Sequence, residues 1–428
     1  MTSFKSSLLF LTLLLGLCLA ANSNAPTARS WRDISGRINR HSTGLVQDFR
    51  SAFQRVFSVQ PEEDDLDKNI EQDFIVGETT DEYDDEDWKS SGSDETDLDD
   101  ALDGTSPTTD TANPTPIPST SPWKLVQMHK GTDFFKGWDF FTASDPTHGI
   151  VNYVDEKTAR KNKLLEFNEL GHAILRVETT PTVKSKRMSV RISTKNYFNG
   201  GIFILDATHI PFGCGVWPAF WTNGPRWPYT GEIDIVEAVN DYTHNQATLH
   251  TDYGCKLPST SSGKLGMSGK VIGGVDCGAH STNNQGCGIR AASNNTYGKG
   301  FNAIDGGMYA MKWDSTGIEV YFFKRGSIPK DIIAGELQPS KWGKPQARWP
   351  ASSCNPSKYF VDHRIIFDTT LCGDWAGNVW GSSGVPGQER SCKARTGYAR
   401  CEDFVRANGA AMKEAYWVIK SVRVWQKV

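Results

Sequence analysis

Three carboxylates lie close together in the segment from Arg226 to Asn240, RWPYTGEIDIVEAVN. Glu232, Asp234 and Glu237 alternate with isoleucine and valine, which is the composition of a buried strand. Residues two apart on a strand share a face, so Glu232 and Asp234 point the same way, whereas Glu237 would point to the other face. One extra residue, a β-bulge between Asp234 and Glu237, would return Glu237 to the acidic face. The sequence therefore predicts a bulged strand with three carboxylates in one row.

Carboxyl groups arranged in this way are suited to the hydrolysis of a glycosidic bond with retention. That reaction uses one carboxylate as nucleophile and one carboxyl as acid/base, about 5–5.5 Å apart. Asp234, between the outer acids, would raise the pKa of a neighbouring carboxyl. A solvated surface strand and a calcium site are the alternative interpretations. Clustered like charges destabilise a strand unless they are used, and no Asp/Asn/Gly loop typical of calcium sites surrounds the acids.

Aromatic residues surround the acidic strand. Trp217, Trp221 and Trp227 precede it closely, and Trp375 lies between glycines in the distant segment CGDWAG. Exposed indoles can stack on the apolar faces of sugar rings. Packing in the core is the alternative for any tryptophan; it stays open for Trp217, whereas we expect Trp221 and Trp227 to line a cleft. His250, in TLHT, follows the acids.

The composition of the 428-residue chain changes along its length. Residues 1–20 have the pattern of a signal peptide, with Lys5 before an apolar stretch. Residues 21–104 form an N-terminal extension in which positions 62–103 hold 20 acidic residues against two lysines, which predicts disorder. Residues 105–122 are a linker rich in Thr, Ser and Pro. Residues 123–428 form the domain that carries the acids, with 37 basic and 27 acidic residues.

The pattern of this domain is that of an all-β protein. Short alternating runs occur at 172–178, 189–194, 201–207 and 421–426, and residues 308–323 have the pattern of a hairpin. Only residues 401–417 suggest a helix. The predicted fold is a two-sheet antiparallel sandwich. Eight cysteines follow residue 200, which predicts four disulfides in a secreted protein. Zinc is the alternative, but no C-x-x-C pair is present.

The motif EIDIVE, together with DPTHGIVNYVD, GCGVWPAFW, TLHT and CGDWAG, resembles glycoside hydrolase family 16 in its fungal laminarinase-like form, over nearly all of residues 123–428. The resemblance implies a jelly-roll sandwich with a concave cleft and retaining hydrolysis of internal bonds in β-1,3- or mixed β-1,3/1,4(1,6)-glucans. It implies the following roles: Glu232 as nucleophile, Glu237 as acid/base, Asp234 as helper, Trp221, Trp227, His250 and Trp375 near the cleaved bond, and Asn152 and Arg191 on the glycone side. For Arg191, an outward strand residue is the alternative.

Other functions are kept as alternatives. A cell-wall glucan transglycosylase would use the same nucleophile, and a glucan-binding protein would have an inactive site. We expect no cofactor and no metal, β-glucan as the partner, no nucleic acid, no membrane anchor, a monomeric state, and a secreted, extracellular or cell-wall-associated location. The acidic extension and the segment 387–404, GQERSCKARTGYARCEDF, do not match the pattern of the family.

Overall fold

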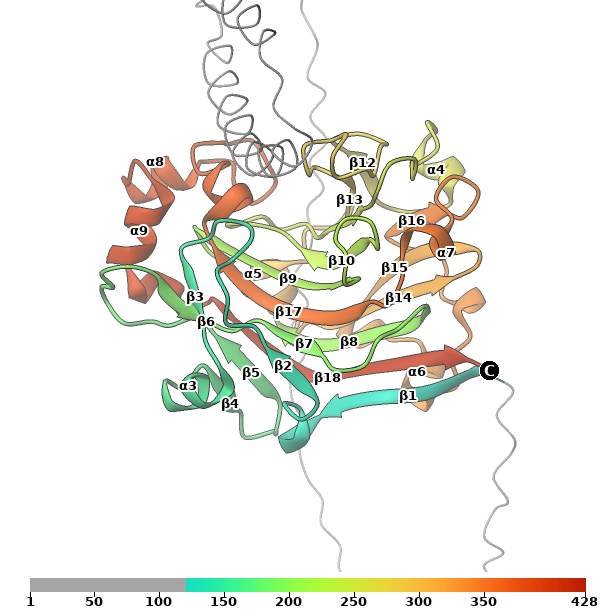
Figure 1. Cartoon of the computed structure of the whole chain (residues 1–428), viewed down its shortest axis with the longest axis horizontal. Helices are drawn as coiled ribbons and strands as arrows, with labels where there is room; N and C mark the ends of the chain where they lie inside the picture. Colours follow the sequence, from blue (N-terminus) through green and yellow to red (C-terminus); the bar gives the residue numbers. More distant parts are fainter. Residues whose placement is uncertain (1–120) are drawn as a thin grey trace, which may run out of the picture. The chain divides into compact units, whose positions relative to one another are not determined.

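The computed structural model describes residues 121–428, and the predicted signal peptide, the acidic extension and the linker up to residue 120 lie outside that range. Within it, two large antiparallel sheets form the fold (Figure 1). The acid sheet, named for the three carboxylates, has the strand order β12 (Lys270–Ile272), β13 (Cys287–Arg290), β11 (Gln246–His250), β10 (Glu232–Glu237), β9 (Val216–Asn223), β17 (Arg364–Leu371), β7 (Ile192–Thr194) and β2 (Trp138–Phe140).

The second sheet, the back sheet, packs against the acid sheet. Its strand order is β16 (Ala347–Pro350), β15 (Gly317–Lys324), β14 (Gly307–Asp314), β8 (Gly201–His209), β18 (Tyr416–Lys427), β5 (Ala173–Arg176) and β4 (Leu165–Phe167), and β1 (Trp123–Lys130) also pairs with β18. A small parallel pair consists of β3 (Val151–Tyr153) and β6 (Arg187–Ser189). The all-β, two-sheet sandwich predicted from the sequence is therefore confirmed.

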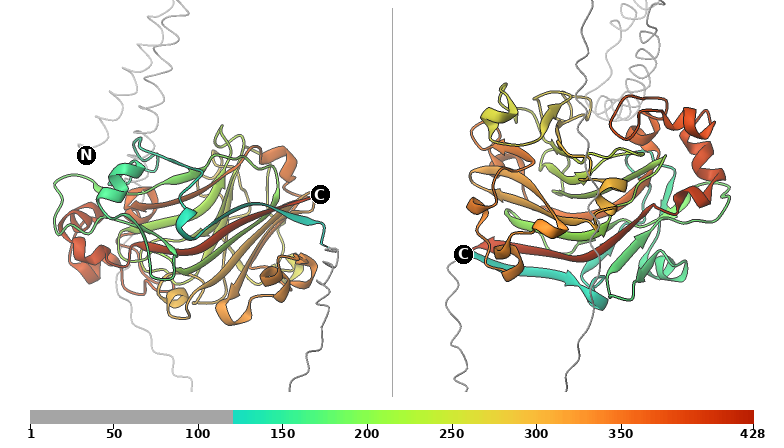
Figure 2. Two further views of the ribbon diagram at one scale, coloured as in Figure 1. Left: turned by 90° about the horizontal axis from the view of Figure 1, so that it is seen from below. Right: turned by 180° about the vertical axis from the view of Figure 1, so that it is seen from behind.

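In the part of the chain that the structure describes, the helices are short and lie in the connections between strands (Figure 2). The α-helices are α3 (Glu156–Lys161), α4 (Ser262–Leu265), α5 (Gly298–Asn302), α6 (Lys330–Ala334), α7 (Pro356–Tyr359), α8 (Cys392–Thr396) and α9 (Cys401–Ala407). The 3-10 turns are η1 (Gly131–Asp133), η2 (Arg325–Ser327), η3 (Pro339–Lys341) and η5 (Gly409–Met412), and η4 (Gly373–Gly377) is a π-turn. Within residues 121–428, no helix has the length and apolar character that crossing a bilayer requires.

Aromatic side chains fill the space between the two sheets. Phe220 of β9 and Phe367 of β17 have ring centroids 4.7 Å apart. Phe367 in turn contacts Trp417 of β18 in the back sheet, at 5.3 Å. Ile233, which alternates with the acids of β10, is fully buried. The inner face of β10 therefore anchors the strand in the core, which leaves its other face for the carboxylates.

Two sequence predictions for local structure need correction, whereas the hairpin is confirmed. Asp314 pairs with Gly317 across the two-residue turn of the predicted hairpin. The run 189–194 was predicted as one strand, but it is split, because β6 pairs with β3 whereas β7 pairs with β17. The predicted helix 401–417 ends at Ala407. Asn408 leaves the helical conformation, with φ −132° and ψ 69°, and the chain continues as the turn η5 and then as strand β18.

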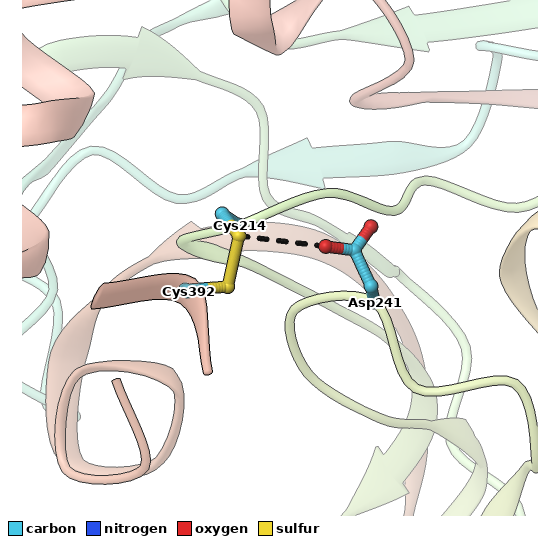
Figure 3. Close-up of side chains that lie close together, drawn as sticks. All are labelled: Cys214, Asp241 and Cys392. Carbon is cyan, nitrogen blue, oxygen red and sulfur yellow. Dashed lines mark hydrogen bonds between the residues drawn. A yellow bond between two sulfur atoms is a disulfide. The ribbon is translucent and has the colours of Figure 1, made fainter. Parts of the chain in front are cut away.

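Four disulfides cross-link the described domain, as the cysteine count predicts, and the zinc alternative loses its ligands because all eight thiols are used. The pairs are Cys214–Cys392, Cys255–Cys354, Cys277–Cys287 and Cys372–Cys401. Two of them hold the segment 387–404, which contains α8 and the first residues of α9. At Cys214–Cys392, the carboxylate of Asp241 lies 3.4 Å from Sγ of Cys214 (Figure 3) and forms an ion pair with Arg395.

The two ends of the described chain lie side by side. Trp123 of β1 pairs with Lys427 of β18. The N–H of Val428 donates to the carbonyl of Pro122 at 3.0 Å, and Oγ of Ser121 donates to the carbonyl of Leu337 at 2.9 Å. Residues 121 and 122, at the end of the predicted linker, are thus bonded to the fold.

Candidate active site

The bulge predicted in the acidic strand is present. Asp234 pairs with Trp221, and Glu237 pairs with Ala219. Between these two pairs, β10 contains one residue more than β9, and the register shifts between Asp234 and Val236. Glu232 pairs with Asn223, two positions from Trp221. All three acids therefore oppose residues of one parity on β9, and they share one face of the sheet.

The side chain of Asn245 holds the bulge in place. Its Oδ1 accepts the N–H of Glu237 at 3.0 Å, and its Nδ2 donates to the carbonyl of Ile235 at 2.9 Å. These are backbone groups that a bulge leaves without ladder partners, and buried polar groups of this kind need a bond. Asn245 itself is fully buried. Sequence reasoning missed this residue, which fixes the position of Glu237.

Glu232 lies at the more open end of the acid row. It is half-buried and is paired across the sheet with His250 of β11. The indole Nε1 of Trp227 donates to Oε2 of Glu232. Trp227 is 42 % exposed, so part of this side chain is open to solvent beside the carboxylate; that it lines a substrate cleft stays a prediction.

Asp234 is the most deeply buried of the three acids, with 2 % of its surface exposed. Its Oδ2 lies 3.4 Å from Nε2 of His250, and polar atoms of Glu232, Asp234 and His250 lie within 4.8 Å of one another. Burial raises the pKa of Asp234 well above its ordinary value, and the charges of Glu232 and Asp368 raise it further. Asp234 and Glu232 can therefore share a proton.

Glu237 occupies a closed environment. The indole Nε1 of Trp217 donates to its Oε1 at 2.7 Å. Burial raises the pKa of Glu237 well above its ordinary value, and the charge of Asp234 adds to this, whereas Trp217 and His250 lower it. Glu237 can therefore keep a proton at pH values at which an exposed glutamate has lost it. Trp217, which the sequence left open between core and cleft, has this specific bond.

Trp375 joins the site at the Glu237 end. It lies on η4, half-buried, and its ring meets that of Trp217 edge to face, with centroids 5.8 Å apart. Trp375 therefore contacts Trp217, which in turn is hydrogen-bonded to the carboxyl of Glu237. The structure thus brings together six of the residues predicted from the sequence: Glu232, Asp234, Glu237, Trp227, His250 and Trp375.

Arg191 and Trp221 form a second group beside the acids. The guanidinium of Arg191 lies 4.9 Å from the ring centroid of Trp221 and 4.6 Å from that of Phe141. Trp221 is only 8 % exposed, so Arg191 and its neighbours cover most of a ring that the sequence predicted to line the cleft. Asn152 is exposed on β3, outside the acid sheet.

Asp368 is an acidic residue of the site that sequence reasoning missed. It lies on β17 and pairs with Ala219, the residue that also pairs with Glu237. Burial raises the pKa of Asp368 to about 7, although the charge of Arg191 lowers it. The signal in the sequence is an aspartate between apolar residues in RIIFDTTL, but nothing local connects it with acids more than 130 positions earlier.

Comparison with known proteins identifies the family. Residues 138–425 match the family described as "XgeA-like, catalytic GH16 domain". A probable glycosidase of Schizosaccharomyces pombe is 43 % identical over 305 residues, 71 % of this chain and 69 % of the relative. A probable endo-1,3(4)-beta-glucanase of Aspergillus clavatus is 37 % identical over 308 residues, 71 % of this chain. The chain spans 46 % of the length of the latter relative.

Solved structures give the same result. Laminarinase 16A of Phanerochaete chrysosporium, a GH16 enzyme solved with β-glucans in its donor and acceptor sites, is 36 % identical with a TM-score of 0.64, over 71 % of this chain and 99 % of that one. A structure described as an elongating GH family 16 β-1,3-glucosyltransferase is 34 % identical with a TM-score of 0.63, over 71 % of this chain and 100 % of that one. This chain therefore belongs to glycoside hydrolase family 16.

Proposed function

We propose that this chain is a secreted, retaining endo-β-glucanase that hydrolyses internal bonds of β-1,3- or mixed β-1,3/1,4(1,6)-glucans. Membership of family 16 supports glycosidic chemistry. The name of the Aspergillus clavatus relative and the β-glucans bound to the Phanerochaete chrysosporium laminarinase support the substrate class. The four disulfides support secretion.

The observation that carries the proposal is the contrast between the two outer acids of the bulged strand. Glu232 is half-buried at the open end, where Trp227 orients its carboxylate. Glu237 is enclosed, and its burial favours the protonated form. Two carboxyl groups in unlike environments on one face are what a nucleophile and a general acid require.

The proposed reaction has two steps. In the first, Glu237 gives its proton to the glycosidic oxygen while a carboxylate oxygen of Glu232 bonds to the anomeric carbon, and the leaving chain departs as an alcohol. In the second, the Glu237 carboxylate removes a proton from water, whose oxygen bonds to the anomeric carbon as the bond to Glu232 breaks. Asp234 keeps its proton through both steps, which its burial favours, and stands next to the Glu232 carboxylate as a hydrogen-bond partner.

Retention is supported by the origin of both acids on one short strand. Inversion needs room for a water between base and sugar, with carboxyl groups about 6.5–9.5 Å apart, whereas retention needs about 5–5.5 Å. Because the bulge returns Glu237 to the face of Glu232, side chains from positions this close can converge.

Product analysis on three soluble glucans tests the proposal. We expect the protein to release oligosaccharides of mixed length from laminarin, a β-1,3-glucan, and from lichenan, a mixed-linkage glucan. A soluble β-1,4-glucan should not be cleaved. Failure to cleave laminarin and lichenan alike would refute the proposed activity, and release of a single short product from chain ends would refute internal cleavage.

A glucan transglycosylase is the second candidate, because the glucosyltransferase of family 16 shares 34 % of its sequence with this chain. The same glycosyl-enzyme would then react with a sugar hydroxyl instead of water.

We also propose a division of the whole chain into four parts: residues 1–20 as signal peptide, 21–104 as acidic extension, 105–122 as linker and 123–428 as catalytic domain.

A further inference from the structure

We propose that Asn294 carries an N-linked glycan, and that this oligosaccharide is attached before the turn around Asn294 folds. In the 428-residue sequence, Asn294 is the one asparagine that is followed by a residue other than proline and then by serine or threonine. The tripeptide Asn294-Asn295-Thr296 is therefore an acceptor sequence for N-glycosylation in a secreted protein. This inference rests on the secretion proposed above and adds to it a covalent modification of the domain.

The side chain of Asn294 is open to solvent. It lies in the turn 291–297, which joins β13 of the acid sheet to α5 (Figure 1), and Asn294 is exposed there. A glycan is bulky and hydrophilic, so the side chain that carries it must lie at the surface of the folded domain. Asn294 meets this condition.

Thr296, the third residue of the acceptor sequence, has the opposite environment, because it is only 4 % exposed. Its Oγ1 accepts the N–H of Asn245 at 2.9 Å and donates to the carbonyl of Ser293 at 2.8 Å. The carbonyl of Thr296 accepts from the hydroxyl of Tyr309, which belongs to the core cluster. The hydroxyl that the acceptor sequence requires is thus enclosed and fully bonded.

The backbone of the turn is packed against its neighbours as well. The carbonyl oxygen of Asn294 lies so close to Gly300 of α5 that a Cβ at position 300 would come within 2.0 Å of it. At the start of the turn, the N–H of Ala291 donates to the carbonyl of Asn245 at 2.8 Å. The hydroxyl of Thr296 therefore becomes accessible only when the turn opens.

The contrast between Asn294 and Thr296 determines the order of events. An enzyme that glycosylates this site must contact both the amide of the asparagine and the hydroxyl at the third position, because the acceptor sequence requires both. In the folded domain, only Asn294 is within reach. The oligosaccharide must therefore be attached while residues 291–297 are unfolded, before Thr296 bonds to Asn245.

The reaction transfers an oligosaccharide from a lipid diphosphate, which is the second substrate. The amide nitrogen of Asn294 bonds to the anomeric carbon of the first sugar, and the bond between that carbon and the diphosphate oxygen breaks. The lipid diphosphate leaves, and the amide nitrogen gives up one of its two protons to solvent. No oxidation or reduction takes place.

Thr296 has a second role once the turn has folded. Asn245, whose N–H it accepts, holds the bulge of β10 through the N–H of Glu237 and the carbonyl of Ile235. One hydroxyl thus marks Asn294 for glycosylation and later supports the acid row through Asn245. Loss of the glycan and loss of this hydroxyl should therefore have different effects, which separate variants can distinguish.

The test uses the full chain, secreted from a eukaryotic host, and compares its mass before and after treatment with peptide-N-glycosidase. We expect the wild type to lose one N-glycan. Peptide mass spectrometry should then find aspartate in place of Asn294, because the glycosidase hydrolyses the side-chain amide. Asn294→Gln should abolish the change in mass and leave kcat/KM on laminarin unchanged.

Asn355→Gln is the matched control. Asn355 is exposed and is followed two residues later by Ser357, but Pro356 stands between them and excludes the tripeptide as an acceptor. This variant should keep the change in mass of the wild type.

Two variants of Thr296 separate its two roles. Thr296→Ser keeps the hydroxyl and should keep the glycan. Thr296→Val should lose the glycan as Asn294→Gln does. It also leaves the buried N–H of Asn245 without its partner, so it should unfold at a lower denaturant concentration than Asn294→Gln. Equal unfolding midpoints in Thr296→Val and Asn294→Gln would refute the second role of Thr296.

A second experiment tests the order of events. Full-length chain without glycan, produced in the bacterial periplasm, is offered to the transferase and a lipid-linked oligosaccharide, once folded and once reduced and unfolded. Only the unfolded chain should accept the oligosaccharide, and equal acceptance by the folded chain would overturn the proposed order. Secreted protein without an N-glycan on Asn294 would overturn the site itself. Retention of the chain inside the cell would refute the proposed secretion, and this inference with it.

Discussion

Replacement of Trp217 by phenylalanine should extend activity to higher pH. Trp217 donates its indole N–H to the buried carboxyl of Glu237 at 2.7 Å and thereby lowers the pKa of Glu237 against the larger effect of burial. A hydrogen bond to a charged group contributes about 1.5–3 kcal/mol. Its loss should therefore shift the equilibrium between ionised and neutral Glu237 toward the neutral form by about 10- to 100-fold.

The sign follows from the proposed role. The general acid must be protonated when the substrate binds, so activity declines as the pH rises through the pKa of Glu237. Trp217→Phe raises that pKa, and the alkaline limb of kcat/KM on laminarin should move to higher pH, whatever happens to the maximal rate. The measurement is a pH profile of kcat/KM at constant ionic strength.

Trp342→Phe provides the matched control. Trp342 is also buried, and its indole donates to the carboxylate of Asp331 at 2.7 Å, but it lies in the core cluster of the back sheet. This variant should lose stability without moving the alkaline limb. An unmoved limb in Trp217→Phe, or a limb displaced to lower pH, would refute the assignment of Glu237 as the acid.

Four further outcomes are expected. Glu232→Ala should lose nearly all turnover on laminarin, and azide should restore activity with formation of an inverted glycosyl azide, whereas near-native activity without azide would contradict its role as nucleophile. Proton NMR of the wild-type reaction should detect the β-anomer before mutarotation, and early α-anomer would rule out retention. Burial raises the pKa of Asp368 from 3.8 to about 7, so the folded chain keeps a proton there that the unfolded chain loses. The free energy of unfolding should therefore fall between about pH 4 and pH 7. Asp368→Asn should remove this part of the decline, which denaturant unfolding at several pH values measures. A chain that starts at Ser121 should retain kcat/KM on soluble laminarin, because it keeps both sheets and all three acids of the described domain. A large loss in the folded protein would assign a catalytic role to the extension.

The acid row was predictable because its geometry is local. The spacing of Glu232, Asp234 and Glu237 among apolar residues requires an extra residue if all three are to share a face, and the register shift in β10 supplies it. The strand character of the domain and the hairpin at 308–323 follow from equally local patterns. Where a prediction failed, as at 189–194, the cause was a change of partner strand that no local alternation records.

The surroundings of the acids depend on pairings across long sequence distances. Asp368 reaches the site because β17 pairs with β9, and Asn245 supports the bulge from beyond the end of β10. The role of Trp217 could not be predicted from the sequence around it. The same local sequence is compatible with a tryptophan packed in the core and with one that donates a hydrogen bond to Glu237. The disulfide pairing was equally inaccessible, because eight cysteines allow 105 arrangements.

The pairing of β1 with β18 determines how the domain responds to a pulling force. Trp123 and Lys427 are register partners, and Pro122 is bonded to Val428, so both ends leave the sandwich at one corner. A force applied between Ser121 and Val428 would load the ladder between these strands at its end, where the hydrogen bonds open one pair after another instead of all at once. Tethered by both ends, the domain would yield first by peeling β1 from the back sheet, while the acid sheet and its disulfides stayed intact.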